Sequence, residues 1–302
     1  IQELFMKRFS IVLLLTFGSF IYAQEANTIY FNNEFLPNSE VGDVSKTTIG
    51  VDIPVINSND KESFSVGASY QSTNLTYVDR DVPFETYQIE GFHTFALKLQ
   101  YNRILKNNWG VTLMAQSQIS SNFDEMDFSE KDLFFNGALI FDKLNEEKRS
   151  MWSFGVINDA QYGLYFPIPT VSYTKRINDS WAYKLGVPDS RVKWTWNKNS
   201  SFEAFTALDG FTGNINDDIE IYKEDYLGTL RQTSVVIGLE YNFNFWRNFQ
   251  LNAKGGYTLY NHMEVQGYDN EEIYDFNMVN GWYFNVGMSY KLGKKVKLKS
   301  PY

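Results

Sequence analysis

The sequence predicts an all-β protein, a single up-and-down antiparallel transmembrane β-barrel, on three observations. Apolar and polar side chains alternate along many short segments, as in 281–292, where Trp282, Phe284 and Val286 alternate with polar or small residues. Successive side chains of a strand point to opposite faces, so each segment has one apolar and one polar face. Aromatic residues make up 17% of the chain, and no long apolar helix follows the N-terminus. This combination is typical of a barrel with lipid outside and water inside.

The N-terminus has the features of a secretory signal peptide. A Met-Lys-Arg start at 6–8 precedes the mostly apolar stretch 9–22, which is short for a spanning helix of about twenty residues. Residues 1–5 resemble an upstream extension of the reading frame. We therefore assign 1–23 to the signal peptide with its extension and 24–302 to one outer-membrane barrel. A membrane anchor at the N-terminus is the alternative.

Fourteen segments carry the strand pattern, an even number as in single-chain bacterial barrels. The first segment mixes its two faces, so twelve strands is the alternative count. The predicted strands are 27–36, 46–56, 63–78, 92–104, 109–120, 132–143, 151–162, 167–177, 181–187, 190–197, 201–212, 229–243, 249–263 and 281–292.

The connections between these strands differ in length. Short turns rich in Asn, Asp and Ser are predicted at 57–62, 106–108, 145–150, 178–180, 197–200 and 245–248. Most of the others are longer (79–91, 121–131, 213–228 and 264–280), and two, at 163–166 and 188–190, are tight. With fourteen strands and both termini in the periplasm, all the short turns fall at the inner end, as outer-membrane barrels require.

Alternation sorts the side chains of each predicted strand between two faces. The apolar face carries, among others, Leu97, Leu185, Val192 and Leu239, and we predict that it contacts lipid. Aromatic belts mark membrane interfaces, and tryptophans lie near predicted strand ends: Trp109, Trp152, Trp181, Trp196, Trp246 and Trp282. A soluble β-sandwich would not need tryptophan at the ends of its strands.

The opposite face carries charged and amide groups. Lys or Arg costs roughly 2–4 kcal/mol on the lipid side at mid-depth, so we predict that these groups line the lumen: Lys98, Gln116, Gln118, Lys184, Arg191, Lys193, Glu203, Asp209, Glu240 and Lys254. Two interpretations stay open. One is a web of cross-strand ion pairs that stiffens or plugs the barrel, with Glu240 beside Lys254. The other is a polar path for a solute, without strong ion selectivity because both signs are present.

The net charge of −9 is concentrated in three long connections and predicts an acidic outer rim. Its members are Asp124, Glu125, Asp127, Glu130, Asp217, Asp218, Glu220, Glu224, Asp225, Glu264, Asp269, Glu271, Glu272 and Asp275. Expected partners are outer-membrane lipid, lipopolysaccharide bridged by divalent ions, and the barrel-assembly machinery. Nucleic acid is excluded because phosphate binding needs clustered Lys and Arg. A Ca²⁺ site at 214–220 is a weaker hypothesis, since the segment lacks the glycine and spacing of an EF-hand.

Catalytic residues have little support in the sequence. The two histidines, His93 and His262, lie near outer strand ends, on predicted strands far apart around the wall. No hydrolase, metalloprotease or phosphate-loop motif is present, so no enzyme, metal or cofactor is predicted. A rim hydrolase built around one histidine is the low-ranking exception.

Several motifs resemble an uncharacterised family of outer-membrane β-barrel proteins of the Bacteroidetes type, a domain of unknown function. They are YAQ at 22–24, FLPNS at 35–39, VDIPV at 51–55 and GVPDSRVKW at 186–194. The resemblance covers about residues 27 to 292 and implies a membrane barrel, without an established substrate or active site.

We therefore expect a narrow outer-membrane channel or facilitator for a small polar or amphiphilic solute in a Gram-negative bacterium. The alternative is a non-transporting barrel whose acidic and aromatic outer loops, with Tyr268, Tyr274 and Phe276, bind a surface partner. Arg191 is expected to tie the 188–190 hairpin to Asp209 or Glu203 across the lumen. The pattern specifies neither the cargo nor the oligomeric state.

Overall fold

The structure is a computed structural model that describes residues 27–37, 42–58, 61–78, 82–123, 129–164, 166–216, 219–222, 225–246, 248–268 and 271–292. The predicted signal peptide lies outside the described residues. So do seven of the predicted rim acids, at positions 124, 125, 127, 217, 218, 224 and 269. No helix among the described residues is long and apolar enough to cross a membrane.

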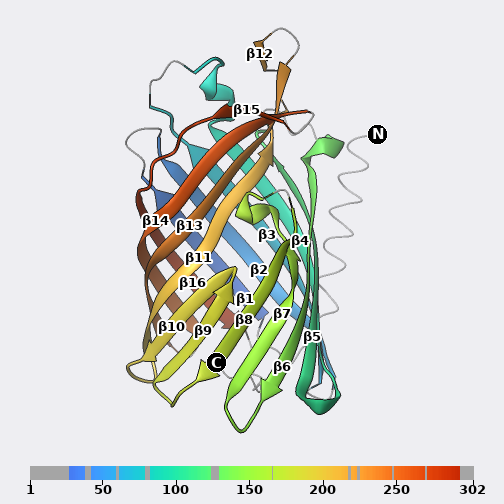
Figure 1. The fold of residues 1–302 in the computed structure, drawn as a ribbon, viewed down its shortest axis with the longest axis vertical. Coiled ribbons are helices and arrows are strands. Elements are labelled where there is room, and N and C mark those ends of the chain that lie inside the picture. The colour runs from blue at the N-terminus through green and yellow to red at the C-terminus, as the bar shows by residue number, and fades with distance from the viewer. Residues whose placement is uncertain are drawn as a thin grey trace.

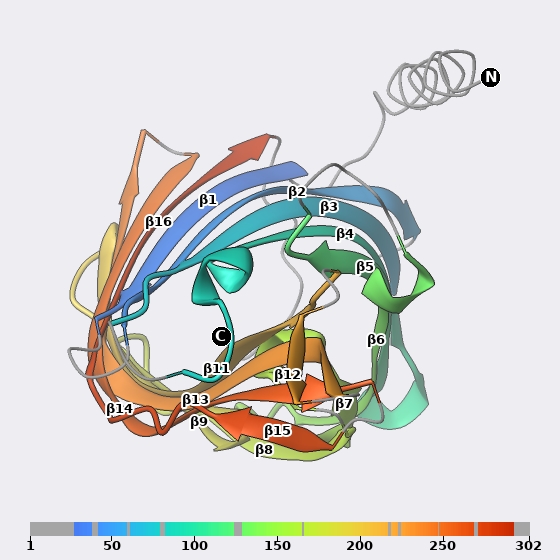
Figure 2. The ribbon, with the colours of Figure 1, turned by 90° about the horizontal axis from the view of Figure 1, so that it is seen from above.

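Fourteen antiparallel strands close into a barrel (Figures 1 and 2). The wall strands are β1 (Asn27–Leu36), β2 (Val44–Ser58), β3 (Glu62–Leu75), β4 (Gly91–Ile104), β5 (Trp109–Ser121), β6 (Leu133–Asn145), β7 (Ser150–Asn158), β8 (Ile168–Arg176), β9 (Trp181–Val187), β10 (Asp189–Thr195), β11 (Ser200–Asn214), β13 (Asp225–Phe245), β14 (Phe249–Gly267) and β16 (Trp282–Leu292). Each pairs with its neighbours in the sequence, and β1 closes the ring on β16, with Asn27 opposite Leu292. The prediction of fourteen strands is confirmed, and the first strand, the least regular in sequence, completes the ring.

The two ends of the barrel differ as the turn pattern predicts. All six short turns lie at one end, which is the lower end in Figure 1. The long connections lie at the other end and carry two short strands, β12 (Glu220–Tyr222) and β15 (Glu272–Asp275). They also carry three short 3-10 helices: η1 (Thr86–Ile89), η3 (Glu130–Asp132) and η4 (Ala160–Tyr162). A fourth, η2 (Lys106–Asn108), forms a turn at the lower end.

The outer wall is apolar, as the alternation predicts. Leu97, Phe135 and Leu239 on three different strands are 61%, 70% and 67% exposed. Side chains that large lie on the surface of a barrel when lipid replaces water around them. Five of the six tryptophans lie at the short-turn end, and Trp282 begins β16 at the opposite end. The predicted lipid face and the position of the tryptophans at strand ends therefore agree with the structure, with most of them at the short-turn end.

Several predicted boundaries are wrong at the long-connection end, among them that of the strand predicted over 63–78, which ends at Leu75. The segment predicted as a strand over 151–162 leaves the wall after Asn158 and turns inward as η4, so the 163–166 connection is not tight. Strands β13 and β14 extend beyond the predicted 229–243 and 249–263. At the end of β14, Val265, Gln266 and Gly267 are all buried, which removes the alternation on which the prediction depends.

The upper part of β11 stays paired with β13 and also reaches across to β5. Asn214 pairs in parallel with Ser121, although β6 to β10 separate these two strands around the wall. The Ser120 and Ser121 hydroxyls donate to the carbonyls of Thr212 and Asn214 at 2.8 and 2.9 Å. This crossing is possible because β7 to β10 are only seven to nine residues long, so the barrel wall is shorter between β6 and β11 than elsewhere. The chain of η4 fills the space beneath, where Ala160 accepts from the Thr212 hydroxyl at 3.0 Å.

An apolar plug fills the barrel at the long-connection end. Its centre is Phe92, which is fully buried and lies 5.5 Å from Phe211 between ring centroids. The buried members of the apolar plug are Leu36, Val44, Leu75, Ile89, Phe92, Phe205, Phe211, Ile215, Ile219, Leu227, Leu230, Val236, Met263, Val265, Phe276 and Tyr283. The apolar plug packs side chains of wall strands against those of the long connections at this end, a feature that the sequence pattern does not predict.

Candidate functional site

Described residues line two chambers in the barrel between the plug and the short turns. The first chamber, of about 340 Å³, lies directly beneath the plug, and Phe205, Val236 and Tyr283 belong to both. The second chamber, of about 510 Å³, lies between β5 and β11, nearer to the short turns. Arg191 lines both chambers and therefore stands between them.

A web of ion pairs holds Arg191 in this position. Its Nε lies 3.1 Å from Asp189 Oδ2, and its Nη1 lies 2.9 Å from Glu240 Oε2 and 3.4 Å from Glu203 Oε2. Lys193 pairs with Glu203 at 3.0 Å, and Lys184 pairs with Asp189. Three cations thus meet three carboxylates on β9, β10, β11 and β13. The web joins the 188–190 hairpin to the next two strands of the wall, β11 and β13, and leaves little net charge.

Part of the expected pairing around Arg191 is wrong. Arg191 does reach Glu203 across the strand pair, but Asp209 is held by another cation, Lys46. Glu240 lies opposite Lys254 in the β13–β14 register, yet its ion pair is with Arg191. The guanidinium group presents several donors in a plane and can bind several carboxylates at once. This allows it to bind Glu240 in place of the neighbouring lysine.

Lys46 forms the second cluster, which the sequence pattern missed. Its Nζ lies 2.7 Å from Glu34 Oε1, 3.1 Å from Asp209 Oδ1 and 3.1 Å from the Gly210 carbonyl oxygen. The Tyr283 hydroxyl donates to the other Glu34 oxygen at 2.9 Å. Because β2 and β11 are not neighbours in the wall, Lys46 joins two sides of the barrel under the plug. The one available signal is that Glu34 and Lys46, of opposite charge, lie directly opposite each other on β1 and β2.

The remaining predicted lumen residues lie apart from these clusters. Lys98 pairs with Asp52 at 2.7 Å on the β2–β4 side of the wall. Gln116 donates to Gln118 at 3.2 Å, and Asn136 donates to the same Gln118 oxygen at 2.8 Å. Lys254 lines the first chamber. That these residues contact a solute stays a prediction.

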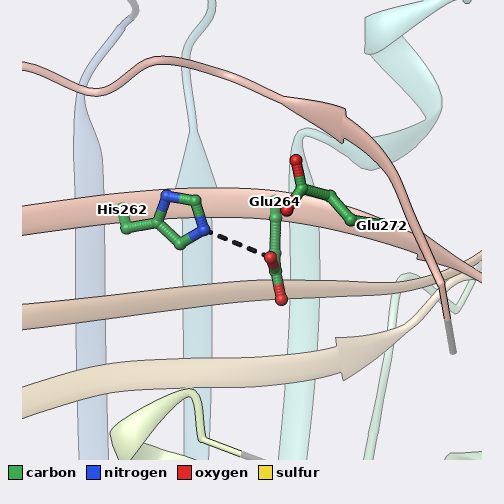
Figure 3. A group of neighbouring side chains, drawn as sticks. All are labelled: His262, Glu264 and Glu272. Atoms are coloured by element: carbon green, nitrogen blue, oxygen red, sulfur yellow. Dashed lines mark hydrogen bonds and ion pairs between the residues drawn. The ribbon is translucent and has the colours of Figure 1, made fainter.

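The long connections contain a cluster that the sequence did not single out as a metal site (Figure 3). His262 Nε2 lies 3.1 Å from Glu264 Oε2, and its Nδ1 lies 3.7 Å from Asp275 Oδ1. One donor atom each from His262, Glu264 and Glu272 lies within 4.8 Å of the other two, a set that could hold a metal ion. The β14–β15 pairing brings these groups together. A metal-binding set of this kind therefore needs one histidine and not both. Partial desolvation, then the carboxylates of Glu264 and Asp275, raise the pKa of Glu272 above its ordinary value.

The other histidine and the weaker calcium candidate have structural partners. His93 Nδ1 lies 2.8 Å from the Tyr70 hydroxyl on the neighbouring strand. Within the candidate segment 214–220, Asn214 and Asn216 donate their amide groups to the two carboxylate oxygens of buried Asp132, at 2.8 and 3.2 Å. These amides thereby fix η3 to the crossing end of β11. The two histidines lie on β4 and β14 and share no partner in the described part of the chain.

Three solved structures show the range of similarity. The COG4313 outer membrane channel from Pseudomonas putida F1 is 8% identical, covers 91% of this chain and 98% of its own, and gives a TM-score of 0.46. A Pseudomonas aeruginosa FadL homologue is 11% identical over 90% and 91%, with a TM-score of 0.40. The KdgM porin is 7% identical over 87% and 98%, with a TM-score of 0.38.

A search of curated proteins finds no match. A family model does match, over residues 19–291, and therefore spans the whole barrel. The chain belongs to the family described as Domain of unknown function (DUF6268).

Proposed function

We propose that this protein is an outer-membrane channel or facilitator for a small polar or amphiphilic solute, exported by a signal peptide at residues 1–23. The observation that carries the proposal is the pair of chambers, with the ion-paired Arg191 between them. A barrel that served only as an anchor would gain nothing from chambers of about 340 and 510 Å³ lined by charged side chains. Charged groups in a lumen tune which solutes pass.

The chambers are arranged in series beneath the apolar plug. A solute from the short-turn end reaches the second chamber, passes Arg191 and enters the first chamber. The plug then closes the route, so its displacement limits the rate of passage. We infer a low and intermittent conductance rather than that of an open porin.

The alternative, a non-transporting barrel with partner-binding loops, has less support from the aromatic residues named for it. Phe276 is buried in the plug, and Tyr274 packs edge-on against it with ring centroids 5.0 Å apart. Tyr268 is the exposed one of the three, and it stacks on Tyr226 at 6.2 Å. Two of the three rings therefore stabilise the plug.

Single-channel recording in planar bilayers tests the proposal. The wild-type protein is expected to give small discrete current steps. Arg191→Gln leaves Asp189, Glu203 and Glu240 with fewer cations, so its reversal potential should shift toward cation selectivity. Lys143→Gln is the matched control, because Lys143 lines neither chamber and donates to the Asn107 carbonyl oxygen at the short-turn end. A folded barrel that gives no steps under any voltage or salt condition would overturn the proposal.

A further inference from the structure

Among the described residues, the first chamber contains one cation without an ion pair and one buried amide oxygen without a hydrogen-bond donor. Lys46 pairs with both Glu34 and Asp209, as described above, while Asp209 Oδ2 accepts no hydrogen bond from the described protein atoms. Arg191 already binds three carboxylates. Lys254 also lines this chamber and makes no ion pair within the described residues; its Nζ lies 5.9 Å from the centroid of the Phe205 ring.

The unpartnered amide oxygen belongs to Asn285. This side chain is 6% exposed, lines the first chamber, and its Oδ1 accepts no hydrogen bond from the described protein atoms. It lies directly opposite Lys254 in the β14–β16 register. A buried acceptor without a donor costs roughly 1–3 kcal/mol. We therefore expect a ligand with a hydrogen-bond donor to bind at this position.

Lys254 and Asn285 together define the chemistry of that ligand. An ammonium group that lacks a counter-ion binds a carboxylate, and an amide oxygen accepts from a hydroxyl group. The adjacent face of Phe205 offers apolar contact to a carbon skeleton. The chamber volume of about 340 Å³ is at the lower end of ordinary small-molecule sites, roughly 300–1,000 Å³. A single small molecule with both groups fits this space.

We propose that the first chamber is a binding site for small hydroxylated carboxylates, with Lys254 binding the carboxylate and Asn285 accepting from a hydroxyl. The site deepens the proposed channel function and rests on it, because it would select the solute held beneath the plug. A neutral polyol lacks the anion for Lys254, and an unsubstituted fatty acid lacks the donor for Asn285. Both should bind more weakly than a molecule that carries both groups.

Titration calorimetry on the detergent-solubilised barrel tests the site, with gluconate as the probe and glucose and hexanoate as comparisons. Gluconate is expected to bind at least about tenfold more tightly than either, since a hydrogen bond to a charged group contributes roughly 1.5–3 kcal/mol. Lys254→Gln should weaken gluconate binding by about tenfold. Lys143→Gln, a lysine at the short-turn end that lines neither chamber and donates to the Asn107 carbonyl oxygen at 2.7 Å, should leave it unchanged.

Asn285→Leu is a second variant, which we expect to fold. It replaces an unpartnered acceptor by an apolar group of similar size, so the melting temperature should stay equal or rise while gluconate affinity falls several-fold. Equal affinities for gluconate, glucose and hexanoate, or full gluconate affinity in both the Lys254 and Asn285 variants, would overturn the site. Current steps without gluconate binding would leave the channel intact and reject the site. Binding without current would keep the site and reject the channel.

Discussion

The two halves of the barrel interior are stabilised by different interactions. At the long-connection end, the plug buries large apolar side chains such as Phe92 and Leu230. Toward the short turns, the interior is held by ion pairs around Lys46 and Arg191 and keeps two chambers. The plug resembles the core of a soluble protein, whose packing leaves few voids. A barrel can therefore be closed at one end by hydrophobic packing and remain polar along the rest of its length.

Lys46 lies at the boundary between these two halves, and its replacement should have the largest effect. In Lys46→Met the carboxylates of Glu34 and Asp209 lose their cation, so the free energy of unfolding should fall by roughly 4 kcal/mol. Urea unfolding in lipid or detergent measures this loss. Lys98→Met breaks the more exposed pair with Asp52 and should cost about 1 kcal/mol or less. Equal losses in the two variants would show that Lys46 is not the cation on which the boundary depends.

The apolar half should respond to the loss of a single ring. Phe92→Ala removes a fully buried side chain and leaves a cavity, so it should lower the free energy of unfolding by roughly 3 kcal/mol or more. Phe135→Ala on the lipid face loses only the transfer contribution, roughly 2 kcal/mol, because no cavity forms. The difference between these two phenylalanine variants, measured in the same urea series, isolates the packing of the plug. A larger loss for Phe135 would contradict a packed plug.

The inward turn of η4 depends on one glycine. Gly163 has φ +69°, and a Cβ built on it would lie 1.9 Å from the Gln232 carbonyl oxygen. Gly163→Ala should therefore cost at least roughly 2 kcal/mol, since the left-handed conformation alone costs about 1–2 kcal/mol for other residues. Gly255→Ala is the control: no atom lies within 4 Å of its Cβ position, so thermal stability should be unchanged or slightly higher. An unchanged thermal stability in Gly163→Ala would mean that η4 is not fixed against β13.

The smallest effect is expected outside the wall, at Glu272. Its raised pKa means that loss of its proton disfavours the folded β14–β15 pairing, so this penalty is present above the raised pKa and absent below about pH 4. Glu272→Gln should therefore slow amide exchange in β15 at neutral pH, and the difference should vanish in acid. Glu146→Gln, in a turn at the opposite end, should change nothing in β15. Slower exchange that persists unchanged in acid would exclude carboxylate repulsion as the cause.

Sequence alternation predicts the wall well because lipid imposes it on every strand. Leu97 and Leu239 face outward to lipid. The charged residues that alternate with such apolar side chains along a strand face away from lipid. Strand count, short turns and tryptophan belts follow from the same constraint. The family resemblance agreed with the barrel, although the matching family model carries no information on the source of the chain.

Sequence alternation predicts neither the plug nor the Lys46 cluster. Segment 210–214 is buried on both faces, so it shows no alternation to detect. Lys46 and Asp209 are 163 residues apart, and their contact depends on β11 bending across the lumen. The shortness of β7 to β10 was visible in the predicted ranges, but only tertiary packing shows that β11 crosses above them.

The most direct test of the two-part interior is the reactivity of single cysteines, which the cysteine-free chain allows without background. Ser69→Cys places a thiol in the lining of the first chamber, and Val265→Cys places one in the fully buried plug. With a charged, water-soluble thiosulfonate and the reconstituted barrel, the account predicts rapid modification at position 69 and almost none at position 265. Equal rates at the two positions would contradict it, because the plug would then be as wet as the chamber beneath it.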